Sequence, residues 1–410
     1  MDFGMKLGAI PEKNYSDYRY DVIFKAYKWD PQVGDSNTVA KYVVLMNRDT
    51  AELLGRLAEQ LSEETMQMEE ALAQKLYLAK KLGLPNEIKK ALTRLSNYDR
   101  SRNVRLMRFD FHPTKIGWMI SEVNSDVPGG LAEASVLPAV ATRYFDGYSP
   151  HKNVADSILV AFQHKMKPGG VAAFVHATSY ADDRQVMQFL GDTFGQNGYQ
   201  TLYAAPDHIK WIDKKAVNTI KGLEGNVDSI IRFFPLEWLA NLPQKKTWLG
   251  HYDCDTVSCN HPISILTQSK RLPLIWDELD VDIPTWKALL PPTVDPKHMH
   301  RQADDWILKP ALGRVGEGIS IKGAASENEC KLIEKAVRKR PQNWVAQQMF
   351  HSQPLTTENG EDYHLCIGVF TVDGKSAGFY GRMNPYPHID ARAKDIPVLV
   401  LDEEDSNHAG

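Results

Sequence analysis

Arg-Phe-Asp-Phe at 108–111 and Ile-Ser-Glu-Val-Asn at 120–124 are two short segments in which polar and apolar residues alternate. In a β-strand every second side chain faces the same way, so Arg108 shares a face with Asp110, and Glu122 shares one with Asn124. The connecting residues 112–117 include proline and glycine, which favour turns. We therefore predict a hairpin that brings these four polar side chains together.

Two carboxylates and an amide oxygen form an all-oxygen ligand set of the kind that Mg²⁺ prefers when it also binds phosphates. Asp110, Glu122 and Asn124 would supply these oxygens. Arg108 adds a planar guanidinium that can bind a carboxylate or a phosphate through two hydrogen bonds. The combination indicates phosphoryl chemistry. The alternative is an ordinary surface hairpin whose charges lie at the strand edges.

The composition is that of a soluble enzyme. The chain has 410 residues, of which 43% are hydrophobic and 24% are charged, and this length is sufficient for two or three lobes. The net charge of −4 and the pI near 6.4 argue against nucleic acid or an anionic membrane as partners. The first residues contain no apolar run of signal-peptide length, and no stretch approaches the ~20 apolar residues of a membrane span. We expect a cytoplasmic protein.

The cysteines do not indicate a disulfide scaffold, because there are four of them in 410 residues. Cys254 and Cys259 are flanked by His251 and His261, which is a loose metal-like cluster. The separation of the two cysteines departs from the two-residue gap that is usual in zinc sites. Reduced thiols are the favoured interpretation, with zinc as the alternative.

The N-terminal part, residues 1–105, reads as helical and is expected to pack on the core. Residues 36–38 can cap a helix that runs through 43–46 and on to Leu61, and a second helix is predicted over 64–82. Gly83, followed by Pro85, is a stop signal for that second helix.

Residues 106–260 contain the hairpin and then a strand–helix–strand pattern. A glycine pair at 129–130 precedes a predicted helix that starts at Leu131, and such glycines allow backbone N–H groups to approach an anion. Residues 170–175 read as a buried strand, 186–190 as part of a helix and 199–203 as the next strand. Ligands bind at the carboxyl ends of strands in such βαβ units.

Asp182 and Asp183 lie in the loop at that end of the predicted βαβ unit. If they face a pocket, their charges suit a cationic amine. Otherwise they stabilise the N-terminus of the following helix through its dipole, an effect of about 0.3–1 kcal/mol. Both interpretations stay open at this point.

Residues 261–410 contain a second set of polyphosphate-binding features. A strand over 306–310 carries Lys309, and a glycine-rich loop follows at 311–318, ahead of a strand at 319–321. Backbone N–H groups of such a loop, together with Arg314, can bind phosphate oxygens, although a plain β-turn has the same composition. The loop is not a Walker motif, because no Gly-Lys-Ser/Thr follows. It is the expected lid over the site.

The rest of this region predicts one helix and three strands. Ser326 and Glu329 form a capping box for a helix that runs to about 339, with Leu332, Ile333 and Val337 facing inward. Residues 344–349 read as a buried strand. Residues 363–372 and 376–383 form a hairpin around Asp373-Gly374, a type I′ turn signal, and its end carries Arg382.

Taken together, these motifs resemble the synthetase domain of glutathionylspermidine synthase. The resemblance rests on Arg-Phe-Asp-Phe, Glu-Val-Asn-Ser-Asp-x-Pro, Phe-Pro-Leu-Glu-Trp at 234–238, Ser-Lys at 269–270, Lys-Pro-Ala-Leu-Gly-Arg-x-Gly, Gln-Gln at 347–348 and Gly-Arg at 381–382. Their order is that of the family, from about residue 10 to residue 400. The resemblance implies an α/β ATP-grasp fold, with a preceding βαβ lobe and N-terminal helices.

The resemblance also implies roles for individual residues. Those roles are Mg²⁺ ligands at Asp110, Glu122 and Asn124; an arginine beside an acyl phosphate at Arg108; a late arginine near the transferred phosphoryl group at Arg382; ATP-binding residues at Lys270, Lys309, Arg314, Gly316, Gln347 and Gln348; and acceptors of a polyamine at Asp182 and Asp183. The family's small hydroxyl residues that help to hold glutathione are replaced here by Val127, Gly129 and Gly130.

We therefore expect a stand-alone member, without the fused amidase domain, that joins a small-molecule acid to an amine with ATP and Mg²⁺ as cofactors. Glutathione and spermidine are not singled out as its substrates. The alternatives are a ligase that modifies a peptide acceptor and a non-catalytic ATP-binding module. A plain kinase fits less well, because the late arginine and the split metal site suit acyl activation.

Overall fold

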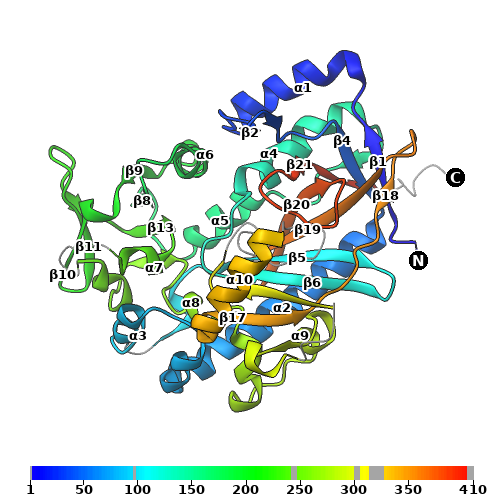
Figure 1. Cartoon of the computed structure of the whole chain (residues 1–410). Helices are drawn as coiled ribbons and strands as arrows, with labels where there is room; N and C mark the ends of the chain where they lie inside the picture. Colours follow the sequence, from blue (N-terminus) through cyan, green and yellow to red (C-terminus); the bar gives the residue numbers. More distant parts are fainter. Residues whose placement is uncertain (1, 96–97, 242–246, 300–304, 314–326, 404–410) are drawn as a thin grey trace, which may run out of the picture.

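The protein is described here from a computed structural model that covers residues 2–95, 98–241, 247–299, 305–313 and 327–403. Its largest sheet, which we call the central sheet, is antiparallel and has the order β21 (Lys394–Ile396), β20 (Lys375–Asn384), β19 (Asp362–Val372), β5 (Leu106–Thr114) and β6 (Gly117–Asn124). The short strand β18 (Leu355–Thr356) adds to β19. Strands from distant parts of the sequence thus lie side by side (Figure 1).

The predicted hairpin over 108–124 is confirmed as β5 and β6. The strands extend further than expected, because residues 112–114 continue β5 and only Lys115 and Ile116 form the turn. The second predicted hairpin is also confirmed as β19 and β20. Asp373 and Gly374 both have positive φ angles, 46° and 83°, as a type I′ turn requires.

The N-terminal helix prediction is wrong in its first part. Residues 43–46 belong to a buried strand, β4 (Tyr42–Met46), which pairs with β1 (Met5–Ala9) and, in parallel, with β22 (Val398–Leu401). The strand β7 (Tyr148–Ser149) completes this sheet. A short apolar run does not distinguish helix from strand, and here its pairing partners lie at the opposite ends of the chain.

The helix α2 (Arg48–Gln74) begins after the strand and runs without the predicted break near residue 62. The Asn47 side chain caps it by accepting a hydrogen bond from the N–H of Thr50 at 2.9 Å. Glu64, at which the second helix was expected to begin, lies inside α2. It is buried and accepts hydrogen bonds from the N–H groups of Thr285 and Trp286. The second predicted helix, over 64–82, is divided in the structure: residues 64–74 form the end of α2, and Leu76–Lys81 form a separate 3-10 helix. The predicted stop at Gly83, which has a φ of +70°, is confirmed.

The predicted βαβ unit is confirmed. Strand β8 (Val171–His176), helix α6 (Ala181–Gln196) and strand β9 (Gln200–Ala204) follow one another, and the two strands are parallel. Strands β13 (Ser229–Phe233) and β14 (Val257–Cys259) extend this sheet. Helices α4 (Leu131–Ala141) and α5 (Val154–Gln163) contact α6 and lie between this sheet and the central sheet (Figure 1).

A small sheet carries the lysine strand. Its order is β15 (Thr293–Val294), β17 (Trp344–Gln348) and β16 (Trp306–Pro310), and helix α10 (Glu327–Lys339) covers it. Val337 and Ile333 pack on this sheet as predicted, whereas Leu332 is exposed, so that part of the inward face is wrong. Ser326 of the capping box, the predicted strand at 319–321 and residues 314–318 of the glycine-rich loop lie outside the described residues.

The remaining elements are short. They are α1 (Glu12–Lys25), α3 (Asn86–Leu92), α7 (Leu236–Leu239), α8 (Ser264–Gln268), α9 (Pro284–Leu289), the hairpin β2 (Gln32–Val33) with β3 (Ser36–Asn37), and a sheet of β10 (Ile209–Ile212), β11 (Lys215–Asn218) and β12 (Gly225–Asn226). Because the central sheet and the β4 sheet each combine strands from more than one of the predicted regions, those regions are interleaved in space. None of the helices in the described ranges is both long and apolar enough to cross a bilayer.

Candidate functional site

One face of the central sheet carries a row of polar side chains. Asp395 of β21 pairs with Arg382 of β20, which pairs with Cys366 of β19. Two residues away on the same strands, and on the same face, Tyr380 pairs with Gly368, and Gly368 pairs with Asp110 of β5. The opposite face is apolar: α2 packs against β19 and β20, and Phe109 and Phe111 of β5 are buried in the same hydrophobic core. The alternation of the strands therefore separates a reactive face from the core.

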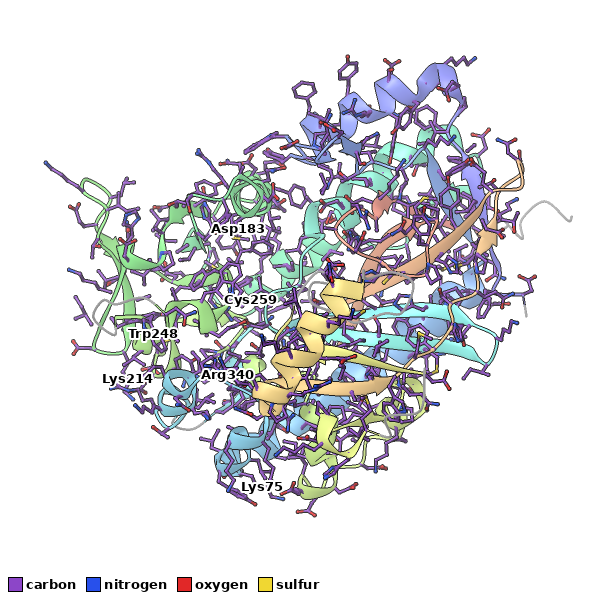
Figure 2. All side chains as sticks on the ribbon, viewed as in Figure 1. Lys75, Asp183, Lys214, Trp248, Cys259 and Arg340 are labelled. Carbon is purple, nitrogen blue, oxygen red and sulfur yellow. The ribbon has the colours of Figure 1, made fainter. Side chains whose placement is uncertain are left out.

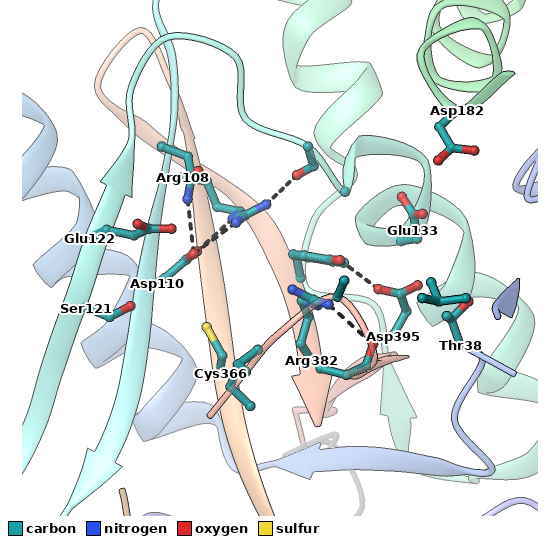
Figure 3. A pocket seen from close by; sticks show the side chains of 18 of the residues that line it. Thr38, Arg108, Asp110, Ser121, Glu122, Glu133, Asp182, Cys366, Arg382 and Asp395 are labelled. Atoms are coloured by element: carbon teal, nitrogen blue, oxygen red, sulfur yellow. Dashed lines mark hydrogen bonds and ion pairs between the residues drawn. The ribbon is translucent and has the colours of Figure 1, made fainter. Parts of the chain in front are cut away.

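The predicted cluster of Arg108, Asp110 and Asn124 is present on this face. Arg108 binds the Asp110 carboxylate through two hydrogen bonds of 2.7 and 2.9 Å, and its third nitrogen donates to the carbonyl oxygen of Gly129 at 2.6 Å. The Asn124 amide donates to the Asp110 carboxylate at 3.0 Å. Figure 3 shows Arg108 beside Asp110. Burial opposes the charge of Arg108, but the adjacent Asp110 carboxylate outweighs it and raises the pKa of the guanidinium.

Gly368 makes this arrangement possible. A Cβ atom at this position would lie 2.8 Å from Cδ and 3.1 Å from Nε of Arg108, so the arginine side chain crosses β19 in space that only glycine leaves open. Any larger residue must displace Arg108 from Asp110.

We expect Gly368→Ala to lower the rate of any reaction at this site by about 10–100-fold, because a displacement near 1 Å can cost that much. The fold should be retained, since only a side chain has to move. The matched control is Gly195→Ala in α6, where a Cβ atom would meet Thr201 at an ordinary 3.8 Å. Equal activities of the two variants in a turnover assay would contradict this role of Gly368.

Two lysines approach the hairpin from the small sheet and from the chain segment after α8. Lys270 forms an ion pair with Glu122 at 2.9 Å and donates to the carbonyl oxygen of Gly313 at 2.6 Å. Lys309 donates to the side chain of Gln347 at 2.7 Å and to the carbonyl oxygen of Ser121 at 3.2 Å. Residues that are distant in sequence are thus joined by their charges.

The charges around Glu122 and Lys309 change the pKa values of these two residues. Burial alone would raise the pKa of Glu122, but Lys270 and then Lys309 outweigh it and lower the pKa to about 2. Burial, aided by Lys270 and opposed by Glu122, lowers the pKa of Lys309 to about 8. Glu122 is therefore anionic at neutral pH, and Lys309 is mostly cationic. A buried cation of this kind is suited to hold a polyphosphate.

Arg382 is held by the backbone. Its guanidinium donates to the carbonyl oxygens of Asp390 at 2.6 Å and Ala393 at 3.3 Å, while its buried Nε has no hydrogen-bond partner within the described chain. A cavity of about 690 Å³ lies against it and is also lined by Arg108, Asp110, Glu122, Asn124 and Lys309. Figure 3 shows Arg382 and Arg108 projecting from neighbouring parts of the same face.

The other predicted nucleotide-binding residues divide into three groups. Lys270 and Gln347 line a smaller pocket that shares Glu122 and Lys309 with the large cavity. Gln348 is exposed on the other side of β17, so it does not join Gln347. Arg314 and Gly316 lie outside the described residues.

Asp182 and Asp183 line the large cavity in the first turn of α6. Asp182 accepts a hydrogen bond from Gln185 at 3.1 Å, and Figure 2 shows Asp183 at α6. Burial, and then the neighbouring Asp182, raise the pKa of Asp183 to about 6. Both residues thus line the cavity and also lie at a helix N-terminus, and their role as acceptors of an amine stays a prediction.

Sequence reasoning missed a second buried charge cluster in this cavity. Lys28 lies between Glu133 at 2.9 Å and Asp395 at 2.7 Å, and Tyr380 donates to Asp395 at 2.7 Å. All four line the cavity. They come from four separate segments and form no local motif, and the only signal was that Tyr380 and Arg382 are two apart on one strand.

The predicted Mg²⁺ ligands fit a hard cation by their donor set. Asp110 and Glu122 are ionic partners of Arg108 and Lys270, but a carboxylate has about four lone-pair sites, so both retain oxygen lone pairs. Asn124 uses its amide nitrogen toward Asp110, which leaves its oxygen available as a ligand. Across the described ranges, no group of three or more His, Cys, Asp or Glu residues is arranged to hold a metal, and the zinc alternative is not formed. Cys254 and Cys259 are free thiols, and Cys259 is buried.

The comparisons with known proteins agree with this architecture. The sequence model of the family described as glutathionylspermidine synthase preATP-grasp matches residues 13–401. A glutathione synthetase-like effector (GSS30) from Globodera pallida is similar in structure, with a TM-score of 0.63 and 10% identity over 96% of this chain and 98% of that one. At this identity the similarity shows the fold alone.

A putative gamma-glutamylcysteine synthetase from Methylobacillus flagellatus gives a TM-score of 0.39 and 11% identity over 82% of this chain and 88% of that one. No curated protein sequence matches the chain. The family match and the shared fold confirm the α/β ATP-grasp architecture that the sequence predicted. The chain belongs to the glutathionylspermidine synthase preATP-grasp family.

Proposed function

We propose that this protein is an ATP-dependent ligase that forms an amide between a small-molecule carboxylate and an amine through an acyl phosphate. One observation carries the proposal. Arg108, Lys309 and Arg382 face the same cavity as the oxygen ligands Asp110, Glu122 and Asn124, although they come from three distant parts of the chain. A binding site for a triphosphate beside a reacting carboxylate needs this combination of cations and a metal.

The chemical problem is charge repulsion. ATP carries about four negative charges, and an anionic carboxylate must approach its γ-phosphoryl group. Lys309 and Lys270 lie where they can neutralise phosphate oxygens, and Arg108 and Arg382 can bind the carboxylate and the transferred group. When bound by Asp110, Glu122 and Asn124, Mg²⁺ would supply further neutralisation of the phosphates. The arginines stabilise the charge that spreads over the equatorial oxygens during transfer.

The second half of the reaction joins the amine. Water would hydrolyse an acyl phosphate, so the reacting groups must be shielded from solvent. The amine attacks the acyl carbon in its neutral form, a C–N bond forms as the C–O bond to phosphate breaks, and the amine loses a proton. Asp182 and Asp183 lie on the same cavity and would attract the cationic form of an incoming amine or polyamine.

The sign of the Asp183 pKa shift gives a prediction. Its folded-state pKa of about 6 is above the unfolded value, so this carboxyl stabilises the fold below about pH 4 and the contribution is lost as the pH rises through 6. Asp183→Asn cannot ionise. We therefore expect this variant to melt at a higher temperature than the wild type at pH 7.5, and at nearly the same temperature below pH 4. We also expect its KM for the amine to rise.

Asp156→Asn is the control for that prediction, because Asp156 is an exposed residue in the first turn of α5. It should leave both quantities unchanged. A melting temperature that falls at pH 7.5 in Asp183→Asn alone would show that this carboxylate stabilises the helix rather than serving a ligand.

The function is tested by measuring release of ADP and phosphate in the presence of Mg²⁺, with short peptides and amino acids crossed against amines and polyamines. We expect ADP release to require both an acid and an amine. We also expect it to be lost in Asp110→Asn, which replaces the carboxylate by a neutral amide. Release that is unchanged in Asp110→Asn would overturn the assignment. Calorimetry that shows tight ATP binding without ADP formation would identify a non-catalytic module, and mass spectrometry that shows a modified peptide would identify a peptide acceptor.

A further inference from the structure

Lys28 lies in a connecting segment that follows α1, and no motif singles it out. Its ammonium group forms ion pairs with Glu133 at 2.9 Å and Asp395 at 2.7 Å, and its side chain is only 15% exposed. The next residue, Trp29, donates its backbone N–H to the side chain of Gln185 at 2.9 Å. The segment is thus attached both to α4, through Glu133, and to α6.

Asp395 connects Lys28 to the reactive face. It lies directly opposite Arg382 across the β20–β21 pair and accepts a hydrogen bond from Tyr380 at 2.7 Å. Its backbone bonds to Thr38 at 2.7 Å and to Ala40 at 2.9 Å. Despite its burial, Lys28 and then Arg382 hold the pKa of the Asp395 carboxyl below its usual value. The carboxylate is therefore fixed on several sides.

Both arginines of the site, Arg382 and Arg108, are connected to Asp395 through intermediate contacts. The carbonyl oxygens of Asp390 and Ala393 that hold Arg382 belong to the segment that leads to Asp395. Tyr380 lies with its ring centroid 5.0 Å from the guanidinium carbon of Arg108, so its hydroxyl connects Arg108 to Asp395. A movement of Asp395 would therefore displace both Arg382 and Arg108.

We propose that Lys28 is a positioning residue that holds Asp395 in place and thereby fixes Arg382 through the 390–395 segment and Arg108 through Tyr380. Without its ammonium group, the half-buried Glu133 and the buried Asp395 would be two carboxylates with one cation fewer between them. Repulsion between them would move the 390–395 segment. The expected fall in kcat rests on the proposed function, whereas the expected movement of the 390–395 segment does not.

The test compares Lys28→Met with Lys28→Arg, which keeps the charge. The matched control is Lys25→Met, because Lys25 is exposed at the end of α1 and, among the residues that the structure describes, pairs only with Asp21, one turn earlier. For Lys28→Met we expect kcat for ADP release to fall at least tenfold and KM for ATP to stay within twofold. Lys28→Arg should recover most of kcat, and Lys25→Met should match the wild type.

Hydrogen exchange provides a readout without turnover. Lys28→Met should increase amide exchange in peptides that cover 386–396 and leave exchange in β5 and β6 unchanged. Tyr380→Phe is a second variant that keeps the ring and removes only the hydrogen bond to Asp395, and it should lower kcat in the same way.

If the wild type releases no ADP with any acid and amine, the proposed function fails and the exchange data alone decide the inference. Unchanged exchange at 386–396 in Lys28→Met would overturn it. An unchanged kcat in an active Lys28→Met enzyme, or a rise in KM for ATP in place of a fall in kcat, would overturn it as well.

Discussion

Arg382→Ala is expected to lower kcat for ADP release by a factor on the order of 10²–10³, equivalent to about 2.7–4 kcal/mol of transition-state stabilisation. The guanidinium faces the cavity from β20, and the backbone carbonyls of Asp390 and Ala393 fix its orientation. A group aligned in advance in this way stabilises developing charge without reorganisation at the moment of reaction. The measurement is steady-state ADP release with saturating ATP, acid and amine.

The control for Arg382 is Arg56→Ala, which removes an exposed arginine of α2 that forms an ion pair with Glu52, one turn earlier. It should leave kcat unchanged. Because the loss in Arg382→Ala is a loss of transition-state binding, KM for ATP should change much less than kcat. A drop in ATP affinity with an unchanged kcat would assign Arg382 to nucleotide binding instead.

Glu69→Ala is expected to destabilise the fold by about 3–5 kcal/mol, because removal of one partner leaves a buried charge without compensation. Glu69 and Arg105 are both buried, and Arg105 donates to the two Glu69 oxygens at 3.1 and 2.5 Å. Thr267 also donates to Glu69, at 2.6 Å. The change is measured as the shift of the urea midpoint at constant slope.

The next residue in the same helix is the control. Glu70 pairs with Arg100 at 3.3 Å on the surface. Glu70→Ala should lower the free energy of unfolding by no more than about 1 kcal/mol. Equal costs for the two variants would contradict the assigned role of the buried pair.

The buried pair also supports the site. Arg105 precedes β5 and donates to the carbonyl oxygen of Ser125, which follows β6, so it ties the two open ends of the hairpin together. Asp110, Glu122 and Asn124 all lie on this hairpin. We therefore expect Glu69→Ala to weaken ATP binding even under conditions in which the protein remains folded.

Local signals were sufficient for several elements. The Asp373-Gly374 turn and the alternation of β5 and β6 follow from backbone preferences and from the two-residue period of a strand, and both are confirmed. The helix α6 between two parallel strands is confirmed for the same kind of reason. Residues 43–46 were assigned to a helix, because nothing nearby reveals that β1 and β22 pair with them.

The candidate site shows the same division. Arg108, Asp110, Glu122, Asn124, Lys309 and Arg382 were identified from ordered motifs, and all line one cavity. Gln347 lines the smaller pocket and Gln348 is exposed on the other face of β17, because consecutive side chains of a strand point to opposite faces. The ATP-binding role of the two residues stays a prediction. Lys28, Glu133 and Asp395 carry no motif, since a buried ion pair needs only that its members meet in space.

The sequence by itself determined the family, the alternating strands and the identity of the charged groups, because these depend on short spacings along the chain. Only the tertiary structure decided which charges face one another, such as Lys28 with Asp395 and Lys270 with Glu122. The physical reason is that electrostatic interactions depend on distance and burial, and both are set by packing between segments that are more than a hundred residues apart.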